Sequence, residues 1–171
     1  SRGFAPLPFR LGEGPSILSV GAHLKNTIAQ SIAGQVFVSQ HIGDLETAET
    51  AGEFRRATQI FQTLYDRKPE IVSCDKHPGY FSTQYADRLG LPVISVQHHY
   101  AHILSCMAEN ELEGPALGVA WDGTGFGDDG TVWGGEFLRV SKEDYSRVGH
   151  LRKFRLPGSE QAVREPRRSA L

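Results

Sequence analysis

One local pattern occurs twice in this chain: an apolar strand, a polar turn that contains glycine, and a second apolar strand. The first copy spans residues 17–40, and the second spans residues 116–140, about 100 residues later. Between the copies, segments with strand character alternate with segments of helical periodicity, which is typical of a layered α/β fold. The pattern predicts a duplicated architecture with a cleft between its halves. The alternative is that two β-hairpins recur by chance.

Periodicity and turn residues predict the other elements. The clearest helix spans 46–66, where apolar side chains recur every three or four residues and Pro69 follows the end. The remaining predictions are strands at 71–74, 91–96 and 146–154, helices at 81–89 and 98–110, and a helix that begins at Ser159 and is interrupted by Pro166.

The same pattern divides the chain into three parts. Residues 1–15 are rich in proline and glycine, so we expect an extended linker from an upstream domain. Residues 16–113 are expected to form a first lobe. Residues 114–171 are expected to be the start of a second lobe, which is incomplete here.

Composition excludes several classes of protein. The chain carries 18 Lys+Arg against 20 Asp+Glu, a net charge of −2, which argues against a strongly basic nucleic-acid binder. No apolar run approaches the roughly 18 residues of a membrane span, so we expect neither a membrane nor a nucleic-acid partner. Cys74 and Cys106 form no CxxC pair, which favours a reducing, cytoplasmic setting. We expect Cys106 to be a small buried residue rather than a nucleophile.

Three histidines lie close together at the start of the predicted helix 98–110. His98 and His102 are four residues apart, so their rings share one face and can share one metal ion, whereas His99 points elsewhere. Imidazole suits iron or zinc. The helix follows a strand directly, which is where α/β sheets place their sites. The alternative is a pair of helix-start histidines that bond only to backbone or solvent.

A glycine-rich turn, residues 122–130, follows the predicted strand at 116–121. Asp122 can bind a metal or position a magnesium–nucleotide, and the small residues after it let backbone N–H groups converge on phosphate oxygens. Gly134 and Gly135 in the next strand indicate a bulge or the close approach of a ligand. The segment is neither a Rossmann fingerprint nor a P-loop. An ordinary hairpin turn is the alternative, because Asp-Asp-Gly is common turn chemistry.

Two further segments give weaker signals. In residues 21–27, Lys25 could contact phosphate from the first half, although an exposed turn lysine is the simpler interpretation. Residues 74–80 bring Cys, Asp and His together in a loop after a strand. Their spacing matches no common zinc motif, so a substrate loop and a polar turn remain equally open.

Five segments together resemble the family of hydrogenase-maturation carbamoyltransferases HypF. They are residues 21–27, 39–46, 96–102, 117–125 and 133–137. The resemblance implies an α/β fold of the actin-like, sugar-kinase-like ATPase type, with duplicated ribonuclease H-like lobes. This chain is then the first lobe plus the opening strands of the second.

The resemblance also implies site residues. His98 and His102 become ligands of iron or zinc, and Asp122 becomes a third ligand or nucleotide contact and the catalytic residue. The implied contacts to nucleotide or phosphate are Lys25, Gly123, Thr124, Gly125, Gly127, Gly134 and Gly135. The implied cofactors are the metal, Mg²⁺ and ATP or carbamoyl-adenylate.

By the same resemblance, the reaction is carbamoyl transfer from carbamoyl-adenylate to the C-terminal cysteine of HypE, and the group becomes a cyanide ligand of nickel–iron hydrogenase. An upstream domain of the same parent chain forms the carbamoyl-adenylate, so the fragment alone is expected to be inactive. The acceptor cysteine comes from the partner, so the chain needs no nucleophile of its own. The alternatives are a tRNA threonylcarbamoyladenosine-forming transferase and a non-catalytic, nucleotide-binding actin-like module.

Overall fold

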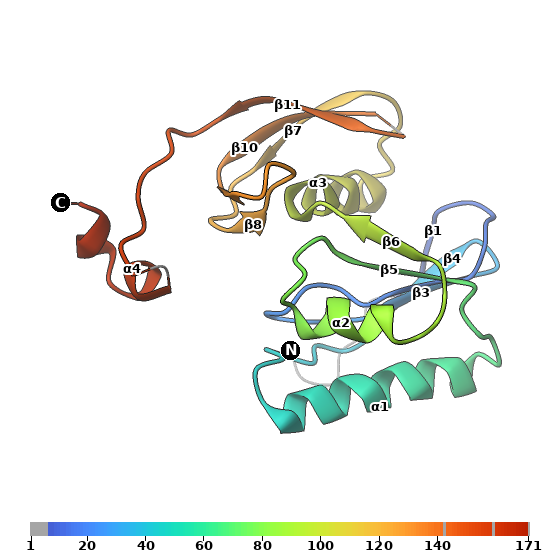
Figure 1. The fold of residues 1–171 in the computed structure, drawn as a ribbon. Coiled ribbons are helices and arrows are strands. Elements are labelled where there is room, and N and C mark those ends of the chain that lie inside the picture. The colour runs from blue at the N-terminus through green and yellow to red at the C-terminus, as the bar shows by residue number, and fades with distance from the viewer. Residues whose placement is uncertain (1–6, 142, 159, 171) are drawn as a thin grey trace.

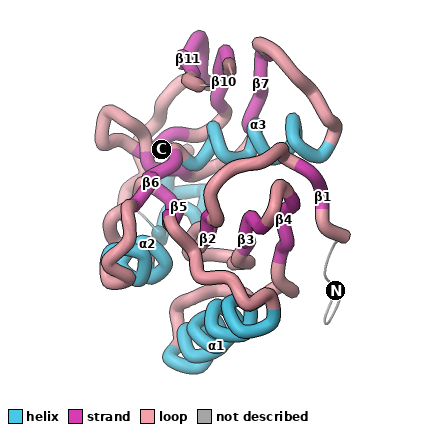
Figure 2. The backbone as a smooth tube through the Cα atoms, turned by 90° about the vertical axis from the view of Figure 1, so that its right-hand side faces the viewer, coloured by secondary structure: helices cyan, strands magenta, loops and turns pink. Residues whose placement is uncertain are grey.

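A single helix, α3 (His98–Glu109), lies between two β-sheets in the computed structural model of the chain. The structure describes residues 7–141, 143–158 and 160–170. Figure 1 shows α1 (Ala48–Leu64) and α2 (Phe81–Asp87) together on one side of the larger sheet, with α3 on the other side. Figure 2, from the side, shows α1 at one end of the molecule and the smaller sheet at the other.

The larger sheet has six strands in the order β1-β4-β3-β2-β5-β6. These are β1 (Phe9–Arg10), β2 (Ile17–Ser19), β3 (Ala29–Ile32), β4 (Gln35–Val38), β5 (Ile71–Asp75) and β6 (Val93–Val96). Strands β1 to β4 pair antiparallel, whereas β2, β5 and β6 pair parallel. Parallel pairing places the carboxyl ends of β2, β5 and β6 at the same edge of the sheet.

Local sequence explains the helices that cover this sheet. The side chain of Thr47 caps α1 by accepting a hydrogen bond from the N–H of Thr50 at 3.2 Å. Phe54 of α1 is fully buried and meets the ring of Tyr85 edge-on at 5.0 Å. These contacts join α1 and α2 to the core formed by the buried residues Leu18 and Val72 of the strands and Val20 and Ile28 beside them.

The smaller sheet, ordered β11-β10-β7, is a three-stranded antiparallel meander. Its strands are β7 (Ala116–Ala120), β10 (Glu136–Val140) and β11 (Tyr145–His150), and a hairpin of β8 (Gly125–Phe126) and β9 (Val132–Trp133) lies between β7 and β10. Leu138 and Val140 are fully buried and form a core with Ile103 and Met107 of α3. The segment after β11 ends in α4 (Glu160–Arg164) and a 3-10 turn (Pro166–Ser169).

Most predicted elements are confirmed, but several differ. The sequence pattern missed β3, so the first copy of the repeat, residues 17–40, contains the three strands β2, β3 and β4. The pattern also missed β8 in the predicted turn, and the strand expected at 146–154 ends at His150. Phe9 and Arg10, expected in a linker, pair with β4; residues 1–6 of that linker lie outside the described residues. The strand expected at 131–140 is two strands, interrupted at Gly134 and Gly135. Ser159, the expected start of the last helix, is also outside the described residues.

The prediction that Cys106 is buried is wrong. Cys74 is buried but Cys106 is exposed. The buried face of α3 carries Ile103 and Met107, and a residue directly before Met107 points about 100° away from it around the helix. Within the described part of the chain, no helix is both long and apolar enough to span a bilayer.

Candidate metal centre

His98, His102 and Asp122 converge at the first turn of α3. Asp122 follows the end of β7, and its Oδ2 lies 2.7 Å from His98 Nε2 and 3.5 Å from His102 Nε2. The two Nε2 atoms are 3.3 Å apart. All three potential ligand atoms lie within 4.8 Å of one another. Two imidazoles and a carboxylate at this separation fit one divalent ion, and iron and zinc accept this donor set.

Asp75 belongs to the candidate site by its contacts, and sequence reasoning did not place it there. Its Oδ2 lies 2.6 Å from Nδ1 of His98, and its Oδ1 accepts the backbone N–H of His77 at 2.8 Å. The carboxylate is 5% exposed. When Nδ1–H of His98 donates to Asp75, the lone pair of Nε2 is free and faces the cluster. A carboxylate that orients a ligand histidine is the usual outer partner of a metal site.

A sequence signal for Asp75 existed. Asp75 is the last residue of β5, and it pairs in register with Val96, the last residue of β6, two positions before His98. Neighbouring parallel strands that end in polar residues bring those residues together. The signal needed the strand order, which the local pattern does not give.

Charge at the centre favours a proton or a cation on His98. Its hydrogen bond to Asp75 raises the pKa of His98 above the usual value, with further contributions from the charges of Asp75 and Asp122, while burial acts in the opposite direction. A metal ligand must be neutral at the coordinating nitrogen. The negative charges of Asp75 and Asp122 stabilise a proton on His98, and a bound metal ion would take the place of that proton.

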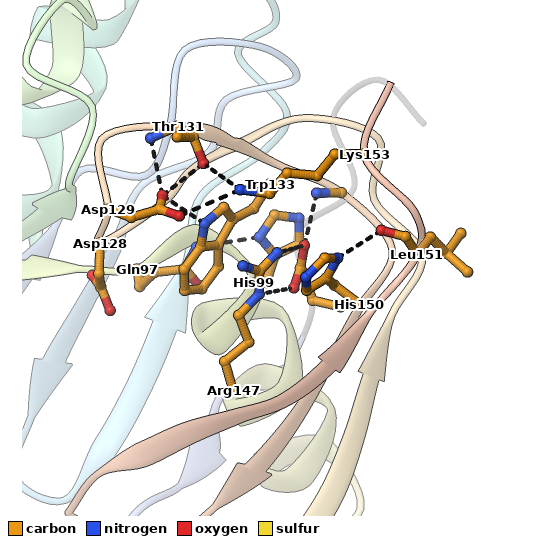
Figure 3. Close-up of polar contacts among 12 residues, drawn as sticks. Gln97, His99, Asp128, Asp129, Thr131, Trp133, Arg147, His150, Leu151 and Lys153 are labelled. Atoms are coloured by element: carbon orange, nitrogen blue, oxygen red, sulfur yellow. Dashed lines mark hydrogen bonds and ion pairs between the residues drawn. The ribbon is translucent and has the colours of Figure 1, made fainter. Parts of the chain in front are cut away.

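His99 turns away from the cluster, as the helical spacing predicted, and the structure shows that it is fully buried. Burial lowers its pKa below the usual value. Its Nδ1 lies 3.2 Å from Nε2 of Gln97, whose Oε1 accepts the N–H of Tyr100 at 2.9 Å and so caps α3. Nε2 of Gln97 also donates to the carbonyl of Phe126 at 3.2 Å. Gln97 thus ties the start of α3 to the β8–β9 hairpin, and Figure 3 shows Gln97 and His99 in the close-up of this region.

The glycines predicted to contact nucleotide or phosphate differ in how closely other atoms of the protein pack against them. A Cβ at Gly125 would lie 2.6 Å from Cε1 of His99, and one at Gly127 would lie 2.1 Å from Nε1 of Trp133. A Cβ at Gly134 would lie 2.4 Å from the carbonyl oxygen of Gly123. Tight packing within the protein thus accounts for these three glycines. A Cβ at Gly123 would meet nothing within 4 Å, so the turn is open to a small molecule there.

A buried ion pair supports the turn from behind. Glu136 is fully buried and accepts two hydrogen bonds from Arg147, at 2.6 and 2.8 Å, and one from the N–H of Gly134 at 3.0 Å. Burial acts to raise the pKa of Glu136, but these donors hold it below the usual value. The guanidinium of Arg147 lies 4.1 Å from the ring centroid of Trp133. This arrangement fixes the strand that runs beside Asp122.

Two cavities flank the cluster. One, of about 480 Å³, borders Asp122, Gly123, Gly134 and Gly135 and has Trp121, Arg147, Arg152 and Lys153 on its walls. The other, of about 500 Å³, borders Asp75, His98 and His102 and is otherwise lined by small polar and apolar residues that include Ser19, Gly21 and Ser73. Thr124 lines a third cavity with Gly123. Lys25 is exposed and lines none of these three cavities.

Comparison with known proteins gives consistent matches over the whole chain. Residues 12–109 match the family described as "HypF Kae1-like domain", and residues 118–171 match "Carbamoyltransferase, Kae1-like Domain, second subdomain". Carbamoyltransferase HypF of Synechocystis sp. is 48% identical over 174 residues, which cover 100% of this chain and 23% of that protein. The chain therefore spans less than a quarter of the length of this relative.

Solved structures show the same likeness. Full-length HypF in the phosphate- and nucleotide-bound form superposes with a TM-score of 0.90 at 44% identity, covering 95% of this chain and 22% of that one. YeaZ from Pseudomonas aeruginosa has a TM-score of 0.51 at 10% identity, covering 80% of this chain and 65% of YeaZ, which supports the fold alone. The expected α/β fold of the actin-like, ribonuclease H-like class is confirmed.

Proposed function

The chain belongs to the HypF carbamoyltransferase family, and from this premise we propose that it forms the metal- and nucleotide-binding part of a longer enzyme that transfers a carbamoyl group. The observation that carries the proposal is the convergence of His98, His102 and Asp122 between two cavities. We keep the division into a first lobe (16–113) and the start of a second (114–171) as part of this proposal.

The metal ligands in this proposal are Nε2 of His98, Nε2 of His102 and a carboxylate oxygen of Asp122. The donor set suits iron or zinc, and the remaining positions would be filled by substrate, water or further chain. When bound, the ion would supply Lewis-acid polarisation of a carbonyl or phosphate oxygen. Asp75 holds the Nδ1 proton of His98 and fixes the direction of its Nε2 lone pair.

The nucleotide side of the proposal is the cavity that borders Asp122 and Gly123. Arg152 and Lys153 on its walls are cations that can bind phosphate oxygens, and Trp121 offers a ring face. The open backbone at Gly123 lets a phosphate approach closely. The expected ligands are ATP or carbamoyl-adenylate with Mg²⁺, and full-length HypF has itself been solved with nucleotide and phosphate bound.

Contacts from the remaining predicted residues, Lys25, Thr124, Gly125, Gly127, Gly134 and Gly135, stay part of the proposal. Gly125 and Gly127 are buried, so any contact from them would be through the backbone. Lys25 is exposed on the loop that follows β2, and its backbone N–H donates to Asp44 at 2.7 Å. Its side chain would have to reach the ligand from outside the three cavities described above.

The acceptor in this proposal is a thiol on a partner, the C-terminal cysteine of HypE. Cys74 is buried, and burial raises the pKa of its thiol above the usual value, so it is a poor nucleophile. Cys106 is exposed on α3, next to Asn110. The sulfur of an external thiol would attack the carbamoyl carbon, the bond from that carbon to the phosphate oxygen would break, and AMP would leave while the thiol proton passes to water. The carbamoyl group on sulfur would have to lose water in a later step before it could become a cyanide ligand of the hydrogenase. We propose a cytoplasmic setting for this reaction.

The test uses the full-length protein that contains this sequence, supplied with ATP, a carbamoyl donor and HypE. We expect stoichiometric iron or zinc, and carbamoylation of HypE that His98→Ala abolishes together with the metal. Carbamoylation of HypE by a protein that lacks metal would overturn the assigned role of the cluster. Transfer to tRNA instead of HypE would favour the tRNA-modifying alternative, and nucleotide binding without any transfer would favour the non-catalytic module.

A further inference from the structure

One carboxylate outside the metal cluster joins three separate parts of the fold. Asp128 lies at the tip of the β8–β9 hairpin. Its Oδ1 is 2.5 Å from Nζ of Lys76, in the loop between β5 and α2, and its Oδ2 accepts a hydrogen bond from the hydroxyl of Tyr145, the first residue of β11. Lys76 and Asp128 are 52 residues apart in sequence. The carboxylate thus bridges the larger sheet and the smaller sheet.

The surroundings keep both ends of this bridge in place. The backbone N–H of Lys76 donates to the carbonyl of Val96 at 3.1 Å, which fixes the loop against the end of β6. The ring of Tyr145 stacks on Tyr100 of α3 at 4.5 Å. Partial burial of Asp128 acts to raise its pKa, but the Lys76 and Tyr145 donors hold the pKa below its usual value. Asp128 therefore stays ionised and paired at neutral pH.

On one side, the bridge lies one residue from Asp75, the partner of the cluster residue His98. Lys76 directly follows Asp75, which holds His98, so one loop contacts both the cluster and the hairpin. On the other side, Asp122 and Asp128 belong to the same glycine-rich segment, and Oδ2 of Asp122 lies 2.7 Å from Nε2 of His98 on α3. The His77 ring adds an edge contact to Phe126 of the hairpin at 5.4 Å.

We propose that Lys76, Asp128 and Tyr145 form a clasp that holds the glycine-rich segment against α3 and so positions Asp122 opposite His98 and His102. The clasp residues are positioning residues: they act through Asp122 and touch no substrate. This inference rests on the proposed metal site. It adds that ligand geometry depends on a contact between the two sheet units.

A second exposed ion pair is the matched control. Nε of Arg168, in the 3-10 turn Pro166–Ser169, lies 3.0 Å from Oε2 of Glu165. The two side chains are about as exposed as those of Lys76 and Asp128, but they are three residues apart and make no bridge between the sheets. Arg168→Met therefore removes a cation from an exposed ion pair without opening the clasp.

The test is a Co²⁺ titration of the full-length protein, stripped of metal, followed by visible absorption. Partly exposed ion pairs contribute modestly, so Lys76→Met should weaken Co²⁺ binding about two- to five-fold. It should also change the Co²⁺ spectrum, because Asp122 is less well placed, whereas Lys76→Arg should restore both. Asp128→Asn should weaken binding similarly, and the double variant with Lys76→Met should be no weaker than the single variants.

The outcomes separate the two levels of the argument. If the unaltered protein fails to bind Co²⁺, the proposed metal site is wrong, and the clasp falls with it. If the unaltered protein binds Co²⁺ but Lys76→Met leaves affinity and spectrum unchanged, or Arg168→Met changes them equally, the metal site stands and the clasp is overturned. Melting of each metal-free variant separates a general loss of folding from a change in the ligands.

Discussion

The sharpest test of the candidate site is the replacement of Asp75 by asparagine. Its carboxylate accepts two hydrogen bonds, from Nδ1 of His98 at 2.6 Å and from the N–H of His77 at 2.8 Å. An asparagine has the same shape, but its amide offers one acceptor oxygen and one donor nitrogen. One of the two donors must then face an NH₂ group. The change also removes a buried negative charge beside the cluster.

The geometry sets the size of the expected effect. Loss of an outer partner of a ligand histidine typically weakens metal binding about 10- to 100-fold. This corresponds to about 1.4 to 2.7 kcal/mol of binding free energy. We expect the upper part of this range, because Asp75 is 5% exposed and water cannot readily replace it. The His98 ring should then favour orientations in which Nε2 no longer faces Asp122.

The assay is a zinc competition titration of the full-length protein with and without Asp75→Asn, with urea unfolding of the metal-free forms. Asp44→Asn is a matched control: Asp44 also accepts a backbone N–H, from Lys25 at 2.7 Å, but it is exposed and contacts no ligand histidine. We expect Asp44→Asn to leave zinc affinity unchanged.

Equal zinc affinity of Asp75→Asn and the unaltered protein would refute the role given to this carboxylate. So would a loss of affinity that Asp44→Asn reproduces. A metal-free Asp75→Asn protein that unfolds at much lower urea but binds zinc normally would mean that Asp75 serves the fold alone.

Three further predictions concern other parts of the structure. His102→Ala should abolish stoichiometric metal in the full-length protein. His99→Ala should keep more metal and lose more thermal stability, because His99 is fully buried. Equal metal loss from both variants in elemental analysis would contradict the assignment of His102, and not His99, as a ligand. Glu136→Gln should cost about 3 kcal/mol of unfolding free energy at pH 7, because it leaves a largely buried arginine unpaired. The ionised Glu136 stabilises the fold above the unfolded-state pKa of about 4.3, and this stabilisation is lost as pH falls through the lower folded-state pKa. If the difference in unfolding free energy between Glu136→Gln and the unaltered protein persists undiminished in acid, this role of Glu136 is contradicted. The isolated chain should self-associate through the outer face of the smaller sheet, where Trp121 is 70% exposed. Trp121→Arg should reduce this association, as measured by sedimentation velocity. An isolated chain that stays monomeric would show that this face does not mediate self-association.

Much of the fold could be predicted because its elements are locally encoded. The apolar spacing of residues 46–66 and the proline that follows predicted α1 to within two residues at each end. The missed strand, β3, carries the alternating sequence Ala-Gln-Ser-Ile, in which a fully buried glutamine replaces the expected apolar residue. Nε2 of Gln30 donates to Arg67 and Ser16 at 3.1 and 3.3 Å. Those partners come from other elements, so local hydrophobicity could not reveal the strand.

The candidate site was predicted in part. His98 and His102 could be paired from their spacing, because a helix places residues four apart on one face. The spacing could not show that Asp75 lies behind His98, and the absence of a zinc-like spacing in residues 74–80 led away from it. The role of the glycines was only partly visible, since Gly125 and Gly127 fit against His99 and Trp133, which belong to different segments.

The sequence by itself determined the α/β class, the repeated strand–turn–strand unit and the shared face of His98 and His102, because these depend on the local periods of strand and helix. The tertiary structure alone decided which carboxylates meet those histidines, that Cys106 faces outward, and that Lys76 meets Asp128 across 52 residues. These contacts depend on strand order and on how the two sheets enclose α3. A local pattern specifies which side of an element is apolar, but the partner of each polar side chain is set by elements distant in sequence.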